Sequence, residues 1–376
     1  MKRLFAIPAV AAVLFLGGCI PSIGPEKDEV IQENDEVEQE TVLIPEVQLN
    51  EHYYRTLLPF KKSASRGLIV NRVYSKYDIG EVEEGLMRLS SKHFDPKDHF
   101  FQEGQFLDQT KTLQWLSRKS EENPEGLNPS VTDKMTPQEI SEKAPIYLAH
   151  ILEQDYYVKT GDKKVGLAGI SIGLAMNSVY YQRDAAEADI PDKTIEQQGM
   201  KMAEAVVQRM RKIDGVGNVP ITVGLFKQES RSSIVPGTYF ATTFVDKGKD
   251  APSGWKEVNE EFVLLPASSK VDNYREVNNT FEKLKEDVNN YFPGFVSIVG
   301  TAFYSDNDLK SLKVKVPIQF YGKNEVIALT QYMTSLVLKY YPDIEVEVSI
   351  TSANGPESLI MKQPGEEEPN VHIYSY

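Results

Sequence analysis

IYLAHILEQDYYVKTGDKKVGLAGISIGLAMNSVYY, at residues 146–181, predicts a long β-hairpin around which the rest of the chain is arranged. We expect one strand over Ile146–Val158 and a second over Lys164–Tyr181, joined at Thr160-Gly161-Asp162. The second segment is rich in glycine, valine and isoleucine, which suits a bent strand better than a helix. Pro145 ends the helix that precedes the hairpin.

Helices are predicted on the N-terminal side of this hairpin. Asp78 and Glu81 have the spacing of a capping box, and the apolar residues that follow recur at helical intervals. Thr136 followed by Pro137 also marks the start of a helix. We further expect a helix from about Leu107 to Ser120, a turn-rich loop over 123–129 and one or two strands within His52–Tyr74.

Helices and strands alternate on the C-terminal side of the hairpin. Apolar residues at helical spacing mark the helices, and short apolar or alternating runs mark the strands. The expected helices are Thr194–Ile213, Lys270–Tyr291 and a segment that begins at Asn324 and ends before Pro342. The expected strands are Pro220–Glu229, Thr238–Val245, Trp255–Leu265, Val296–Tyr304, Leu312–Tyr321, Ile344–Thr351 and Val371–Tyr374.

This pattern predicts an α+β protein of two related subdomains, each with antiparallel strands packed on helices. Shifted by 76 residues, Ile221-Thr222-Val223-Gly224 falls on Ser297-Ile298-Val299-Gly300, and the helices predicted before these strands start at the same offset. Such an offset is typical of a duplicated unit. The expected subdomains are residues 52–250 and 251–376, and the second is compatible with a ferredoxin-like split arrangement.

Residues 1–18 have the features of a signal peptide. Lys2 and Arg3 precede an apolar run, Leu4–Leu16, that is too short to span a bilayer well as a permanent helix. The run ends in Leu16-Gly17-Gly18-Cys19, the arrangement of a lipobox. In a lipobox the cysteine receives a diacylglyceryl group, and signal peptidase II then cuts in front of it.

We therefore expect lipidation at Cys19, with Leu16, Gly17 and Gly18 recognised by the peptidase. The alternative is an ordinary signal peptide with an incidental cysteine, but Cys19 is the only cysteine in the chain. Lipidation implies anchoring at the extracellular face of the membrane through the lipid on Cys19. Diacylglyceryl transferase and lipoprotein signal peptidase would be the partners during maturation, and no disulfide can form afterwards.

The segment after the cysteine, residues 19–51, is expected to be a disordered tether. Residues 20–51 contain ten acidic residues against the single Lys27, a net charge of −9. High charge with low hydrophobicity cannot repay the entropy of folding. The whole chain carries a net charge of −14, which argues against nucleic acid as a partner because phosphates require a basic face.

The residues expected of an enzyme active site or a metal site are not arranged in recognisable motifs. His93 and His99 flank two aspartates and could imitate a metal loop, but their spacing favours a polar turn after a helix. The stretch Gly169–Gly173 formally matches a nucleophile elbow around Ser171, but its flanks read as strand. We predict no catalytic residues, no metal and no cofactor, and interpret the chain as a non-enzyme.

Paired tyrosines are the remaining candidates for a binding surface. Tyrosines side by side could line a groove for a glycan or a peptide, but more often they fill a core between sheet and helix with one wet edge. We favour the core interpretation for all three pairs, which are Tyr156-Tyr157, Tyr180-Tyr181 and Tyr340-Tyr341.

Over essentially its whole length the chain resembles the CamS-type lipoproteins of Gram-positive bacteria. The resemblance rests on the lipobox, the acidic tether, Glu125-Gly126-Leu127-Asn128-Pro129, Ile151–Tyr156 and Gly169–Leu174. It implies that the end of the signal peptide is released as a hydrophobic heptapeptide sex pheromone that triggers plasmid conjugation. Here that segment is Ala12-Val13-Leu14-Phe15-Leu16-Gly17-Gly18, trimmed by a membrane protease.

Three functional hypotheses follow. The first is a signalling precursor, in which processing enzymes do the chemistry. The second is an envelope lipoprotein that holds a peptide, a cell-wall fragment or a partner protein in a cleft between subdomains, and a tyrosine-lined cleft with convergent polar groups would support it. The third, less favoured, is a wall hydrolase that uses paired carboxylates or His93 and His99, which requires two titratable groups facing one pocket.

Overall fold

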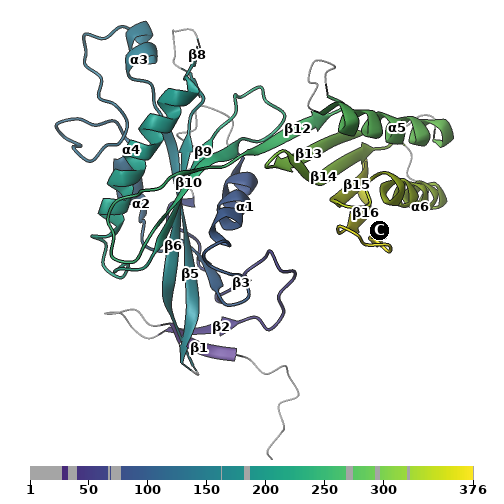
Figure 1. Ribbon diagram of the computed structural model, residues 1–376, viewed down its shortest axis with the longest axis horizontal. Coiled ribbons are helices and arrows are strands. Elements are labelled where there is room, and N and C mark those ends of the chain that lie inside the picture. Colours follow the sequence, from purple (N-terminus) through teal and green to yellow (C-terminus); the bar gives the residue numbers. More distant parts are fainter. Residues whose placement is uncertain are drawn as a thin grey trace, which may run out of the picture.

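Two β-sheets with helices on their faces form the part of the chain that the computed structural model describes (Figure 1). That part comprises residues 28–32, 40–66, 68, 78–161, 163–181, 187–267, 274–292, 297–319 and 322–375. Its helices are α1 (Ile79–Ser90), α2 (Gln109–Leu116), α3 (Pro137–Lys143), α4 (Asp192–Met210), α5 (Arg275–Tyr291) and α6 (Lys323–Tyr340). The α+β prediction is confirmed.

The first sheet is built on the predicted hairpin. Its long strands are β5 (Leu148–Gly161) and β6 (Lys164–Met176), which pair antiparallel. The strand β9 (Ile221–Lys227) lies parallel to β6 after the crossover helix α4, and β10 (Thr238–Val245) pairs antiparallel with β9. The smaller strands are β1 (Asp28–Gln32), β2 (Glu40–Ile44), β3 (Arg55–Thr56), β4 (Phe100–Glu103) and β11 (Lys256–Glu257), while β7 (Val179–Tyr180) and β8 (Ala188–Asp189) pair separately.

Helices cover both faces of this sheet, and Figure 1 shows α4 and α1 on opposite sides of the hairpin. The α4 face carries the large core, and the α1 face packs Val82, Leu86 and Leu89 against the sheet. A strand covered on both faces reads as an almost continuous apolar run, which explains why β6 lacks alternation. Gly169 and Gly173 let two rings approach β6, because a Cβ there would lie 2.2 Å from Phe94 and 2.6 Å from the Tyr239 hydroxyl.

The second sheet follows the sequence order of its strands. These are β12 (Glu260–Leu265), β13 (Val299–Ser305), β14 (Asp308–Pro317), β15 (Glu345–Ser352), β16 (Gly355–Lys362) and β17 (Asn370–Ile373). One face packs on α5 and α6 through Phe281, Leu284, Leu329 and other buried apolar residues. The opposite face carries exposed polar side chains, such as Lys313 and Glu347.

The two subdomains are related, but not at the offset of 76 residues. In the first sheet the run β5-β6-α4-β9-β10 is a hairpin, a helical crossover to a parallel neighbour and a second hairpin. The run β13-β14-α6-β15-β16 repeats that connection. The predicted offset instead aligns β9 with β13. β9 is parallel to β6, the strand before α4, whereas β13 pairs antiparallel with β12, the strand before α5. The offset is therefore wrong.

The ferredoxin-like arrangement is also wrong for the second sheet. A split β-α-β unit needs another strand between its two parallel strands. Here β14 and β15 are parallel and direct neighbours, with seven residue pairs in register from Ser311–Glu345 to Pro317–Thr351, so no strand can insert. The sheets change between β11 and β12, and the predicted subdomain boundary at 250/251 remains a prediction.

The expectation of a disordered tether through residue 51 is wrong for part of that segment. Residues 28–32 and 40–44 form the antiparallel strands β1 and β2. Val42 and Ile44 are 1% and 2% exposed and pack with Leu57, Phe100 and Tyr157. The apolar run Val42–Ile44 outweighs the surrounding acidity, because Val42 and Ile44 gain buried positions on the first sheet.

One of the two predicted capping boxes is present in the structure. Thr136 and Glu139 form the predicted capping box of α3. Asp78 precedes α1 without a side-chain cap hydrogen bond, and the Glu81 side chain accepts a hydrogen bond from Arg88. In the segment His52–Tyr74 only Arg55–Thr56 is a strand among the described residues, and 67 and 69–77 lie outside them.

Candidate functional site

The predicted processing site lies outside the described residues. This holds for Cys19, for the recognition residues Leu16, Gly17 and Gly18, and for the whole heptapeptide segment Ala12–Gly18. The described part of the chain contains no helix long and apolar enough to cross a membrane.

The residues weighed for chemistry have structural roles. Ser171 lies inside β6, fully buried, with its hydroxyl 2.6 Å from that of Ser90, so the elbow motif is strand interior. His93 stacks on Phe244 with ring centroids 4.0 Å apart, and His99 Nδ1 lies 3.0 Å from the backbone oxygen of Asp95. Across the described residues no cluster of His, Cys, Asp or Glu could hold a metal ion.

The tyrosine pairs mostly belong to the cores. Tyr156 and Tyr157 are 0% and 1% exposed, and Tyr180 and Tyr341 are also buried. Tyr156 packs against Phe94 in a ring stack with centroids 4.7 Å apart. The core interpretation is confirmed for these four residues.

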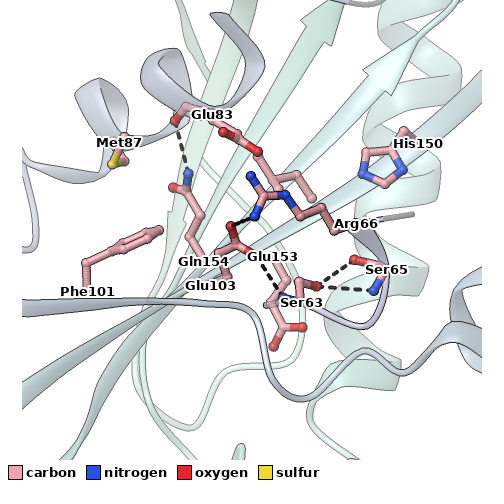
Figure 2. Close-up of a pocket in the computed structure, with 11 residues that line it drawn as sticks. Ser63, Ser65, Arg66, Glu83, Met87, Phe101, Glu103, His150, Glu153 and Gln154 are labelled. Atoms are coloured by element: carbon pink, nitrogen blue, oxygen red, sulfur yellow. Dashed lines mark hydrogen bonds and ion pairs between the residues drawn. The ribbon is translucent and has the colours of Figure 1, made fainter. Parts of the chain in front are cut away.

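A small cavity lies between α1 and the edge of β5 (Figure 2). It encloses about 80 Å³, and Glu83, Glu103 and Glu153 are among the residues that line it. Figure 2 shows Arg66 reaching Glu103, and the ion pair measures 3.0 Å. Burial and the nearby Glu103 raise the pKa of Glu83.

Two buried carboxyl groups stand side by side on β5 next to this cavity. Glu153 and Asp155, both 0% exposed, point to the same face because they are two residues apart. Glu153 accepts hydrogen bonds from the backbone N–H groups of Phe106 (3.1 Å) and Leu107 (2.7 Å), and Asp155 accepts one from Gln105 (2.9 Å). Burial raises the pKa of Glu153 to about 7, and burial and Glu153 raise that of Asp155. The two carboxyl groups thereby hold the loop at residues 105–107, before α2, against β5.

A groove of about 680 Å³ lies between the two sheets. One wall is α1 with the loops around it, and the other is the open face of the second sheet. The groove contains one tyrosine, Tyr53, and not the row of tyrosines that the binding hypothesis expects. Its lining is Asn50, Glu51, His52, Tyr53, Glu81, Glu84, Met87, Arg88, Ser91, Asp95, Pro96, Lys97, Phe262, Phe303, Ser305, Lys310, Ser311, Leu312, Lys313, Glu345 and Glu347.

Arg88 ties the two walls of the groove together. Its guanidinium donates two hydrogen bonds to Glu260 on β12, Nε to Oε1 at 2.9 Å and Nη2 to Oε2 at 2.8 Å. Nη2 also donates to Glu81 Oε1 at 2.7 Å within α1. The guanidinium carbon lies 4.6 Å from the ring centroid of Phe303. Burial raises the pKa of Glu81 to about 7 although Arg88 opposes this.

Sequence reasoning did not single out this groove. Arg88 and Glu260 are 172 residues apart, and nothing local to either residue predicts their pairing. The capping-box spacing at Glu81 was the nearest signal, because it drew attention to a carboxylate at the start of α1. The arrangement can bind a ligand between two walls that a buried ion pair holds in place.

The chain matches a family model, CamS sex pheromone cAM373 precursor, over residues 60–368. The chain belongs to this family. The family resemblance seen in the sequence is thereby confirmed, and the family description is that of a pheromone precursor. No curated protein matches the chain.

Solved structures of the same kind are similar to this CamS-family chain. A sex pheromone precursor from Lactobacillus salivarius subsp. salivarius UCC118 is 30% identical with a TM-score of 0.80, and the match covers 88% of this chain and 98% of the other. The C-terminal domain of the sex pheromone staph-cAM373 precursor from Staphylococcus aureus is 33% identical with a TM-score of 0.71, covering 82% and 100%.

Proposed function

We propose that this chain is a lipid-anchored precursor whose signal peptide is processed to the heptapeptide Ala12–Gly18. The observation that carries the proposal is the match to a pheromone-precursor family over residues 60–368. Leu16-Gly17-Gly18-Cys19 supports it, because the lipobox places the cut directly after the heptapeptide. The peptide is apolar and uncharged, so it can partition through a membrane and bind a hydrophobic receptor pocket.

The mature chain then stays on the extracellular face of the membrane, held by the lipid on Cys19. Signal peptidase II recognises Leu16, Gly17 and Gly18, and a membrane protease trims the remaining signal peptide. A donor cell with a responsive conjugative plasmid senses the released peptide. In this scheme the described part of the chain catalyses nothing.

Mass spectrometry of a producing strain tests this function. We expect the heptapeptide in the culture supernatant and a diacylglyceryl-modified Cys19 in the membrane fraction. A Cys19→Ala chain is the matched control, because it keeps the heptapeptide sequence but removes the lipidation site, and it should release no peptide. Lipidated Cys19 without any heptapeptide contradicts the pheromone role, and an unmodified Cys19 contradicts the anchor.

The groove between the sheets favours a second role for the mature chain, that of a binding lipoprotein. Ligand sites occur preferentially at the interfaces between structural units, in volumes of roughly 300–1,000 Å³. The groove lies at such an interface with about 680 Å³. Both roles are compatible, since the heptapeptide lies before the proposed cut and is not part of the mature chain. Binding of a short peptide by the purified mature chain tests this role.

A further inference from the structure

The charged side chains of the groove are mostly acidic once its internal ion pairs are set aside. Arg88 is neutralised by Glu81 and Glu260, and Lys310 by Asp308 at 3.2 Å. Several lining residues form no ion pair with any residue that the structure describes. The acids of this kind are Glu84, Asp95, Glu345 and Glu347, and the bases are Lys97 and Lys313. An excess of carboxylates over basic side chains attracts a cation and repels an anion.

The floor of the groove supplies aromatic surface next to these carboxylates. Phe262 and Phe303 pack against each other on neighbouring strands, with ring centroids 4.8 Å apart. Arg88 already lies over Phe303, so the chain itself places a guanidinium on this surface. A basic side chain combines a cationic head for carboxylates with an aliphatic stem that can cover apolar surface.

The spacing of two carboxylates on the floor selects the shape of the ligand. Glu345 and Glu347 are both exposed on β15 and point to the same face, because they are two residues apart in a strand. Two strand residues advance the chain by about 7 Å. In an extended peptide, side chains at alternate positions also share a face and have this same separation.

We propose that this groove binds an extended peptide with basic residues at alternate positions, aligned along β15. One basic side chain meets Glu345 and the next meets Glu347, while the peptide backbone lies over the floor beside Phe303. This inference rests on the binding role proposed above. Lys313 is the internal competitor, because it stands opposite Glu347 in the register between β14 and β15.

Fluorescence anisotropy with defined peptides tests the proposal. The protein is the full mature chain, residues 19–376, with Cys19→Ser so that no lipid is attached. The probe is a labelled, capped heptapeptide in which alanine and lysine alternate. Two comparison peptides have glutamate in place of lysine, or the same three lysines in consecutive positions. We expect the alternating lysine peptide to bind most tightly and to weaken as salt is added.

Charge reversals on exposed residues locate the site. The double variant Glu345→Lys with Glu347→Lys should weaken binding by about tenfold or more at low salt. The matched control is Glu282→Lys with Glu286→Lys on the exposed side of α5, away from the groove, because it changes the net charge by the same amount. That control should stay within about twofold. Lys313→Ser should strengthen binding, since it removes a cation that stands opposite Glu347.

Three results would overturn the inference. Equal weakening by both double variants would mean that the peptide responds only to overall charge. Tighter binding of the glutamate peptide or of the consecutive-lysine peptide would contradict the basic, alternating ligand while leaving a binding role for the cleft. If the folded mature chain, checked by its thermal melting transition, binds none of the three peptides, the binding role is contradicted as well.

Discussion

Replacing Arg88 with methionine tests whether one ion-paired side chain holds the two sheets together. Methionine fills much of the space of the arginine stem but removes the guanidinium. Glu81 and Glu260 then keep their positions, 9% and 5% exposed as side chains, without a cation. Three charge-assisted hydrogen bonds of 2.7–2.9 Å are lost, two of them across the boundary between the sheets.

The size of the effect follows from the burial of the partners. Breaking a buried ion pair from one side costs about 3–5 kcal/mol, because the remaining charge is left uncompensated. Arg88 itself is 34% exposed, so water partly solvates the site and the loss belongs at the lower end, about 3 kcal/mol. Arg88 lowers the pKa of Glu81, so its removal favours the protonated carboxyl. The deficit should therefore shrink as the pH falls from 8 to 5.5.

Urea denaturation of both chains at pH 8 and pH 5.5 measures this loss. A suitable control is Arg231→Met, since Arg231 also lies over a ring, that of Tyr181, and beside a carboxylate, Glu187. Its ion pair is 60% and 69% exposed, and such a surface pair contributes at most about 1 kcal/mol. Adding Glu260→Gln to the Arg88→Met chain should recover part of the stability by removing one uncompensated charge.

A loss of less than about 1 kcal/mol at pH 8, similar to that of Arg231→Met, would refute the role of Arg88 as the tie between the sheets. A loss that stays the same at both pH values would refute the argument from uncompensated carboxylates. Failure of Glu260→Gln to recover any stability would refute it as well, because the cost would then come from packing alone.

Two further predictions concern the part of the chain before the second sheet. In the folded chain burial raises the pKa of Glu153 to about 7 from an ordinary 4.5. Between these two pH values the folded state holds a proton that the unfolded state has released. The free energy of unfolding therefore falls as the pH rises through this window. Glu153→Gln should flatten that fall by up to about 1.4 kcal/mol per pH unit in urea titrations from pH 5 to 8, and an unchanged slope would contradict the assignment. Gly126→Ala should lower the free energy of unfolding by about 1–3 kcal/mol in the same assay, because its Cβ would lie 2.4 Å from the backbone of Arg118. The control is Gly161→Ala, whose Cβ would meet nothing within 4 Å. It should change the free energy of unfolding by less than about 0.5 kcal/mol. Equal effects of the two alanines would contradict the steric argument.

Several elements could be predicted because their signals are local. Short-range geometry is enough to predict α4 and α5 from their apolar stripes at helical spacing. It is also enough to predict β10 from its alternation. The strand β16 was missed, because GPESLIMK lacks a clear period of two and begins with glycine and proline. The strands β1 and β2 were missed because the acidity of their surroundings outweighed two short apolar runs.

The candidate groove could not be predicted in the same way. Its walls come from α1 and from β12 to β15, and its key contact joins Arg88 to a residue 172 positions away. The buried pair Glu153–Asp155 shows the same limit. Its spacing places both carboxyl groups on one face of a strand, but their burial depends on the loop at 105–107 folding back over them.

Residue order alone therefore determines the family, the α+β class and most helices and strands. These depend on short sequence motifs and on backbone preferences within a few residues. Tertiary structure decided which strands are neighbours, which repeat is real, that residues 40–44 join the core, and that Arg88 closes a groove lined with free carboxylates. Those outcomes depend on contacts between distant segments, whose partners are set by how the sheets and helices pack and not by local sequence.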